Sequence, residues 1–217
     1  MIVSSADLLL RLHRMKLIEK SRYPHWWQDY GRWQVIVEAI LTQQTKWENV
    51  EKSMQNLYAL GIDTPNKLLE FDESAIASAI APSGFYRQKA ARILALIFAI
   101  INDFGSFDVF CEAVDRQWLL AQKGLGFESA DSILCYGCKR AVMVVDRYTQ
   151  RLLAALGNEI DDYDEIQAFL MRGIEEDFEA IEGALHIPIE LVYAYFHGAI
   201  VEFCKKQRKI DISQLQE

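Results

Sequence analysis

The sequence predicts an all-α fold, and three observations support that class. Nearly every segment carries apolar residues at the three-to-four-residue spacing of an amphipathic helix. Helix start and stop signals recur between these segments, such as Thr64-Pro65 before one helix and Gly105 after another. The one β-branched run, Val142 to Val145, is short and has no second run to pair with. We therefore expect roughly ten or eleven helices and no sheet.

The expected helices follow one another with short connections. The first begins at Ser5, with Ser4 or Ser5 as its N-cap. The chain then loops through residues 23–27, because a proline biases its predecessor away from the helix. Gly61 and Gly157 are suited to end two later helices. The expected helices start at or span residues 5–12, 33–41, 46–60, 64–71, 73–80, 87–104, 117–122, 129–139, 148–156, 163–176 and 190–206.

Composition limits the class of protein. The chain has 217 residues, 51% of them hydrophobic, which is enough for one large domain or two small ones. Its formal net charge of −8 counts modestly against nucleic acid, so any DNA-binding face must be local. The most apolar run, residues 93–101, is about half of a membrane span. No signal-peptide pattern opens the chain, so we expect a soluble intracellular protein.

The four cysteines do not form a disulfide or metal pattern. Cys135 and Cys138 make a C-x-x-C pair, which is typical of zinc or redox sites. The pair lies inside a helical pattern, with no second pair and no nearby histidine. We interpret the cysteines as ordinary buried thiols.

A tight turn built on Gly124 and Gly126 separates two of the expected helices. Glycine allows a positive φ and lets another backbone come close. Backbone N–H groups at the start of the second helix, with the helix dipole behind them, would bind a phosphate without sequence preference. Nearby Lys123 would add positive charge. The alternative is a plain helix-turn-helix whose glycines serve packing.

A carboxylate, Asp146, directly follows the apolar run. Its simplest role is to cap the next helix, because aspartate there accepts the free N–H groups of the first turn. If it also faces a cleft, it is available for chemistry. The residues alone leave both roles open.

These features together resemble the helix-hairpin-helix DNA glycosylases of the endonuclease III superfamily, in which such a hairpin precedes an apolar run ending in Val-Asp. Residues 40–45, Ile-Leu-Thr-Gln-Gln-Thr, are similar to the family's L-x-x-Q-x-T segment, with Ile40 in place of leucine. Residues 83–90 are similar to its G-[FLY]-x-x-x-K-A segment. Residues 25–205 follow the family pattern in the same order.

Two departures from the family pattern narrow the resemblance. Bifunctional members carry a lysine shortly after the hairpin, where this chain has Glu128, so no obvious Schiff-base nucleophile is present. Many members hold a [4Fe–4S] cluster with four C-terminal cysteines, and only Cys204 lies in that region, so the resemblance implies no cluster. With Trp26-Trp27 near the N-terminus, the chain is most similar to the cluster-free 3-methyladenine DNA glycosylases.

The family fold implies two helical lobes with a cleft between them. Residues 31–144 would form a six-helix lobe that contains the helix-hairpin-helix, and residues 1–30 with 145–217 would form the second lobe. Asp146 would stand at the seam as the catalytic carboxylate. Gln43 would fill the hole left by a flipped base, unless it is only a polar residue at a helix end. The implied DNA-binding residues are Gln43, Lys123, Gly124, Leu125, Gly126 and Ser129.

A pocket for the flipped base needs aromatic faces, because N-alkylated purines are cationic and indole attracts cations. Core packing explains Trp33, in its apolar run, but two adjacent indoles in a loop cannot easily both be buried. Glu128 would complement the cationic base or favour a helix start, and Lys205 would reach the pocket rim or belong to a solvated basic tail. The candidate pocket residues are Trp26, Trp27, Trp47, Glu128 and Lys205.

The resemblance implies a monofunctional DNA N-glycosylase that excises alkylated purines, such as 3-methyladenine, by base flipping in base excision repair. Its partner would be damaged double-stranded DNA, with no membrane. We expect a monomer in the cytoplasm, associated with the nucleoid, with no metal or cofactor. A monovalent cation on the hairpin carbonyls is left open, as are the lesion range and the opposite base. His186 receives no role, and His197 is interpreted as a packing residue.

Three alternatives remain at this stage. The first is a bifunctional glycosylase and AP lyase that acts on oxidised bases, with Lys123 or Lys89 as the amine. The second is a non-catalytic helix-hairpin-helix module that recognises bent or abasic DNA. The third is a helical protein that does not bind DNA, which the net charge of −8 favours.

Overall fold

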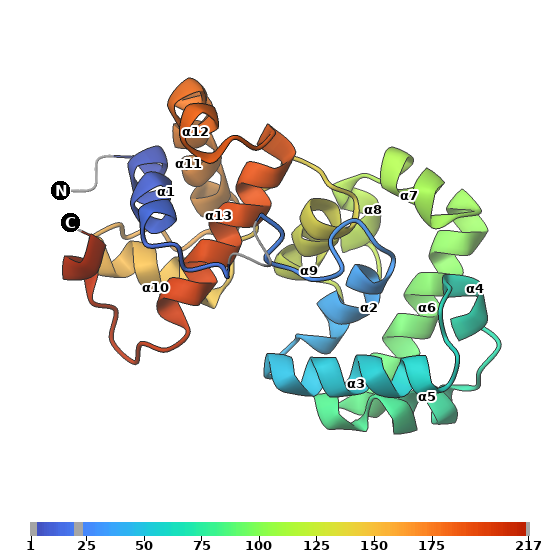
Figure 1. Ribbon diagram of the computed structural model, residues 1–217. Coiled ribbons are helices and arrows are strands. Elements are labelled where there is room, and N and C mark those ends of the chain that lie inside the picture. Colours follow the sequence, from blue (N-terminus) through green and yellow to red (C-terminus); the bar gives the residue numbers. More distant parts are fainter. Residues whose placement is uncertain (1–3, 20–23, 216–217) are drawn as a thin grey trace. The chain divides into compact units, whose positions relative to one another are not determined.

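The computed structural model describes residues 4–19 and 24–215 and is helical throughout (Figure 1). Thirteen α-helices and no β-strand occur among these residues, which confirms the all-α class. Phe107–Ala113 (α7) and Phe178–Leu185 (α12) were not predicted. α7 is only seven residues long. α12 begins directly after Asp177, which ends the preceding helix, and no side-chain cap marks its start.

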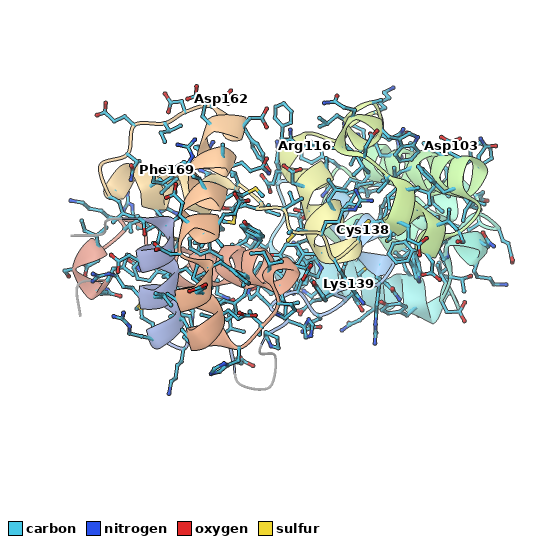
Figure 2. All side chains as sticks on the ribbon, turned by 90° about the horizontal axis from the view of Figure 1, so that it is seen from above. Asp103, Arg116, Cys138, Lys139, Asp162 and Phe169 are labelled. Carbon is cyan, nitrogen blue, oxygen red and sulfur yellow. The ribbon has the colours of Figure 1, made fainter. Side chains whose placement is uncertain are left out.

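Contacts divide the chain into two compact units, and each is described here by itself. The hairpin unit is Gly31–Cys138, and the Asp146 unit comprises the described residues of 1–30 and 139–217. The chain passes between the units at Cys138 and Lys139, which Figure 2 labels. Residues 139–144, which the sequence analysis assigned to the hairpin lobe, therefore group with the Asp146 unit.

The hairpin unit is built around two helices. Gln34–Leu41 (α2) is buried from Val35 to Leu41, as its apolar sequence predicts. It packs against Trp47–Ala59 (α3), Tyr86–Phe104 (α6) and Phe127–Ser132 (α9). α6 packs against α2, Glu73–Ala79 (α5) and α7, and it ends at Gly105, where φ is +77°. The remaining helices of this unit are Pro65–Leu68 (α4) and Arg116–Leu120 (α8).

Two short irregular helices complete the hairpin unit. Ala81–Ser83 is a 3₁₀ turn before α6, and Ile133–Gly137 is a single π-helical turn after α9. The helix predicted over residues 129–139 is therefore in part α-helix and in part π-helix.

The Asp146 unit has an almost fully buried helix, Ile189–Cys204 (α13), at its centre. It packs against α1 (Ser5–Arg14) and α10 (Arg147–Ala155), and α1 in turn packs against α11 (Tyr163–Glu176) and α12 (Figure 1). Ser4 caps α1, as predicted: its hydroxyl accepts a hydrogen bond from the Asp7 N–H at 3.2 Å. A last 3₁₀ turn spans Ile212–Leu215.

No single helix among residues 4–19 and 24–215 is long and apolar enough to cross a membrane, although two helix pairs bent by 78° and 77° reach that length and composition together.

Candidate active site

Asp146 begins α10 and is held there as a helix cap. The segment that leads into it is fixed by α11: Gln167 Nε2 donates to Met143 O at 2.6 Å, and Val145 N donates to Tyr163 Oη at 3.3 Å. Asp146 Oδ1 accepts from both Thr149 N, at 2.8 Å, and Thr149 Oγ1, at 2.9 Å. The capping role is therefore confirmed, and it occupies one oxygen of the carboxylate.

The other oxygen of Asp146 faces a histidine. His197 Nε2 on α13 lies 3.5 Å from Asp146 Oδ2, and the Asp146 side chain is 12% exposed. Burial raises the pKa of Asp146, but hydrogen bonding to His197, the charge of His197 and the two bonds from Thr149 together lower that pKa below 3.8. The carboxylate is therefore ionised at neutral pH and poorly exposed to water.

His197 was interpreted from the sequence as a packing residue. It does pack: its ring lies at 90° to the Trp26 ring, with centroids 5.6 Å apart. Its contact with Asp146 was not predicted, because that contact exists only where α10 and α13 pack together.

Trp26 lies on one face of α13. Its Nε1 donates to Glu202 Oε1 at 2.9 Å. Gly198 makes room for it, because a Cβ at that position would come within 2.4 Å of Trp26 Cγ. Trp26 is partly exposed, while Trp27 is buried and packs edge-on against it at 6.2 Å. The two adjacent indoles thus differ in burial, as expected of them.

Lys205 belongs to the same group of side chains. It follows α13 directly and its Nζ donates to Glu202 Oε1 at 2.6 Å, the oxygen that also accepts from Trp26. The structure thus brings Asp146, Trp26, Trp27 and Lys205 into one unit, and adds His197 and Glu202 to them.

Two other candidate pocket residues belong to the hairpin unit. Trp47 is the first residue of α3, and its Nε1 donates to Glu51 Oε1 at 3.0 Å. Glu128 lies in the first turn of α9 and is exposed, so it is placed where the helix dipole favours a carboxylate.

The predicted hairpin is formed by α8, a tight turn and α9. Gly124 has a φ of +87°, and Leu125 N donates to Gln122 O at 3.2 Å to close the turn. Leu125 is buried, Lys123 is exposed, and Gly126 precedes α9 in extended conformation. The turn therefore presents its backbone and Lys123 to solvent and is anchored by Leu125.

A buried ion pair braces the two helices of the hairpin. Arg116, the first residue of α8 (labelled in Figure 2), donates to both carboxylate oxygens of Asp131 on α9, at 2.8 and 3.0 Å. The Asp131 side chain is 0% exposed, and the Arg116 guanidinium lies 4.9 Å from the Phe127 ring centroid.

Gln43, the predicted plugging residue, is hydrogen-bonded to the hairpin. Its Nε2 donates to Gly124 O and to Ser129 Oγ, each at 3.0 Å, and its Oε1 accepts from Arg92 at 3.1 Å. The Ser129 side chain is buried in this network. A role for either side chain against DNA stays a prediction.

Lys89, one of the two amines considered for a lyase reaction, is buried. Its Nζ donates to Leu41 O, Ser83 O and Thr45 Oγ1 at 2.8–2.9 Å. Burial, with the nearby charge of Arg92, lowers the pKa of Lys89 to about 8. Leu41 and Thr45 lie at and after the end of α2, and Ser83 lies in the turn before α6, so this amine joins the two segments.

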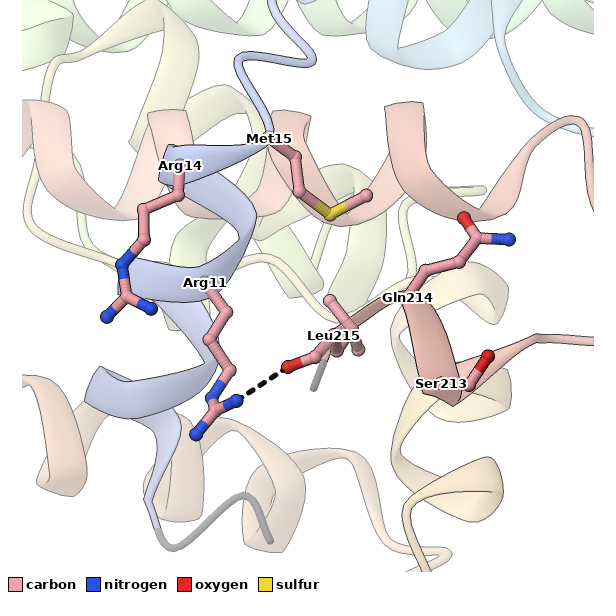
Figure 3. A pocket seen from close by; sticks show the side chains of 6 residues that line it. All are labelled: Arg11, Arg14, Met15, Ser213, Gln214 and Leu215. Carbon is pink, nitrogen blue, oxygen red and sulfur yellow. Dashed lines mark hydrogen bonds between the residues drawn. The ribbon is translucent and has the colours of Figure 1, made fainter. Parts of the chain in front are cut away.

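Within residues 4–19 and 24–215, no group of three or more His, Cys, Asp or Glu side chains could hold a metal ion. A hollow of about 490 Å³ lies beside α1 and the last 3₁₀ turn, where Arg11 Nη1 donates to Leu215 O at 2.7 Å (Figure 3). Its walls contain none of the predicted site residues, being Arg11, Arg14, Met15, Ser213, Gln214 and Leu215.

Comparison with known proteins defines the class to which this arrangement belongs. Residues 37–176, more than half of the chain, match the HhH-GPD superfamily of base excision DNA repair proteins. The chain belongs to this superfamily.

Individual relatives refine the comparison. The chain is 41% identical to the H. pylori 3-methyladenine DNA glycosylase (MagIII), solved with 1,N6-ethenoadenine bound, with a TM-score of 0.90 over 94% of this chain and 98% of that one. It is 33% identical to a protein of Methanocaldococcus jannaschii named as a candidate DNA repair glycosylase, over 92% of this chain and 88% of that protein. It is 27% identical to endonuclease III of Thermotoga maritima, over 88% and 83% of the two chains.

These relatives confirm the resemblance drawn from the sequence, both to the helix-hairpin-helix DNA glycosylases and to their 3-methyladenine branch.

Proposed function

We propose that the chain is a monofunctional DNA N-glycosylase that excises alkylated purines, such as 3-methyladenine, from double-stranded DNA. The observation that carries this proposal is the placement of the Asp146 carboxylate, with its Oδ2 beside His197 and the Trp26 indole against the same imidazole. The 41% identity to a 3-methyladenine DNA glycosylase supports the substrate class.

The carboxylate suits the chemistry of N-glycosidic cleavage. The bond between C1′ and the purine nitrogen breaks with its electron pair going to the base, and positive charge develops on the sugar. Water then bonds to C1′ and loses a proton to solvent. A carboxylate held in a poorly hydrated place stabilises this charge electrostatically. Because its contacts lower the pKa of Asp146, the carboxylate is better suited to act through its charge than as a general base.

The indole suits an alkylated base. N-alkylation leaves a positive charge on the purine ring, and an aromatic face attracts a cation by about 0.5–2 kcal/mol, depending on desolvation. The same base leaves as a neutral molecule, so no strong general acid is needed. Trp26, the partly exposed indole of the Asp146 unit, is the residue that we propose meets the base.

The hairpin suits the DNA backbone. An enzyme that acts on a base must take it out of the stack, and contacts to phosphates position it on the duplex. The turn of residues 123–126 would make such contacts through its exposed backbone and Lys123. Contacts to phosphates do not depend on the base sequence, and a repair enzyme must act in any sequence.

A lyase reaction is the second candidate, and it requires an accessible amine. Lys89 is a poor choice, since its Nζ is buried against three acceptors. Lys123 on the hairpin remains. Borohydride trapping on a lesion-containing duplex tests the point. We expect no trapped adduct; an adduct that forms with wild type and is lost in Lys123→Ala would overturn the monofunctional proposal.

Binding without catalysis is the third candidate. Excision of 3-methyladenine, 1,N6-ethenoadenine and an oxidised pyrimidine should be compared in otherwise identical duplexes, beside binding to an abasic duplex at several salt concentrations. We expect release of the alkylated purines only. Salt-dependent binding without release of any base would favour a recognition module, and no salt-dependent binding would exclude DNA as the partner.

A further inference from the structure

We propose that His197 is a positioning residue that fixes both Asp146 Oδ2 and the Trp26 indole, so that the carboxylate and the aromatic face are held at one spacing. The inference rests on the proposed function for its catalytic consequence. Its structural half rests only on contacts within the Asp146 unit.

The carboxylate side of the contact leaves little freedom. Asp146 Oδ1 already accepts two hydrogen bonds from Thr149, which hold that oxygen at the start of α10. Oδ2 is the remaining oxygen, and His197 Nε2 is 3.5 Å from it. Both side chains are nearly buried, at 12% and 6% exposed. This separation of 3.5 Å lies at the long limit for a hydrogen bond.

The indole side of the contact is equally constrained. Gly198 and Glu202 are four residues apart on α13 and therefore lie on one face of the helix. The Trp26 ring covers this face: it contacts the backbone at Gly198, where no Cβ fits, and donates to Glu202 at 2.9 Å. The His197 ring packs perpendicular to the indole, with an interplanar angle of 90° and centroids 5.6 Å apart. Three fixed points hold the indole in one orientation.

His197 thus contacts both Asp146 and Trp26, the two side chains that would act on the same nucleotide in the proposed reaction. The indole would attract the cationic base, and the carboxylate would stabilise charge on the attached sugar. Misplacement of a reacting group by about 1 Å can cost about 100-fold in rate. An imidazole with a hydrogen on Nε2 can direct Oδ2 through that N–H group. Glutamine shares that property, whereas phenylalanine keeps only the ring.

This difference supplies the test. Wild type, His197→Gln and His197→Phe are compared in single-turnover excision of 3-methyladenine from duplex DNA, with duplex affinity measured separately and folding checked by circular dichroism. We expect His197→Phe to lose at least about ten-fold in excision rate with affinity changed less than two-fold, and His197→Gln to restore most of that loss. Equal rates for His197→Phe and wild type would overturn the proposal, as would equal losses in both variants when both are folded.

A second readout does not need activity. In a ¹⁵N-labelled protein, the indole N–H signal of Trp26 is assigned from its loss in Trp26→Phe. If His197 links the indole to the carboxylate, Asp146→Asn shifts this signal in wild type but not in a His197→Phe background. The same shift in both backgrounds, or none in either, would overturn the link. If wild type releases no base but the shift appears as expected, the proposed function fails and the positioning contact stands.

Discussion

The ion pair between Arg116 and Asp131 gives the sharpest prediction about stability. Replacing Arg116 by Met keeps an aliphatic side chain of similar length and removes the guanidinium, which bonds Asp131 and lies 4.9 Å from the Phe127 ring centroid. The carboxylate of Asp131 then stays buried, at 0% exposed, without the cation that bonds both of its oxygens. Removing one partner of a buried pair costs about 3–5 kcal/mol. Because the Arg116 side chain is 25% exposed, water compensates in part, and we expect a loss of about 2–3 kcal/mol in the free energy of unfolding.

Urea unfolding, followed by circular dichroism, measures this loss, and two variants control it. The double variant Arg116→Met/Asp131→Leu removes both charges and should recover most of the stability. Lys67→Met breaks the exposed pair with Glu70, at 42% and 62% exposed, and should leave the unfolding midpoint unchanged. If Arg116→Met unfolds at the same midpoint as Lys67→Met, the pair between Arg116 and Asp131 does not stabilise the hairpin, and the predicted loss in the free energy of unfolding is wrong.

Three further outcomes are expected in the hairpin unit. Gly124→Ala should lower the thermal midpoint and the duplex affinity, because φ is +87° there and the new Cβ would displace Arg92. Gly126→Ala has open space within the protein and should leave the thermal midpoint unchanged. The free energy of unfolding of wild type, relative to that of Lys89→Met, should increase as pH rises from about 8 to 10.5, by at most about 1.4 kcal/mol per pH unit. The pKa of Lys89 is lowered to about 8 in the folded protein, so the unfolded chain binds the extra proton in that range. A difference that does not change with pH in urea titrations would contradict this. Gln43→Glu can no longer donate to the hairpin, so amide hydrogen exchange in the turn should accelerate, and unchanged exchange would show that this contact does not hold the hairpin.

Much of the local structure followed from the sequence, because local rules decide it. Asp146 was expected to cap a helix and does so, since a cap is formed within one turn. Thr64 and Gly105 likewise begin and end helices as predicted. The unpredicted α7 and α12 are short, and packing rather than propensity supports such helices.

The contacts around the candidate site could not be predicted in the same way. Trp26 and Glu202 are 176 positions apart, and Gln43 and Gly124 are 81 apart, so only the packed fold joins them. His197 lies in an apolar helix where a packing role was the natural interpretation, and only the approach of α10 shows its second contact. The one available signal was Gly198 beside it, since a glycine within a helix often marks close approach by another group.

Asp146 is proposed to release alkylated purines from DNA without cleavage of the strand. One measurement tests it most directly: release of free 3-methyladenine from an alkylated duplex by wild type and by Asp146→Asn, with strand breaks scored before and after alkali. Asparagine retains an N-cap oxygen for Thr149 but lacks the charge, so the fold and duplex binding should persist. We expect release by wild type, a loss of at least about 100-fold in Asp146→Asn, and strand breaks only after alkali. Equal release by both proteins, or strand breaks without alkali that depend on wild-type protein, would contradict it.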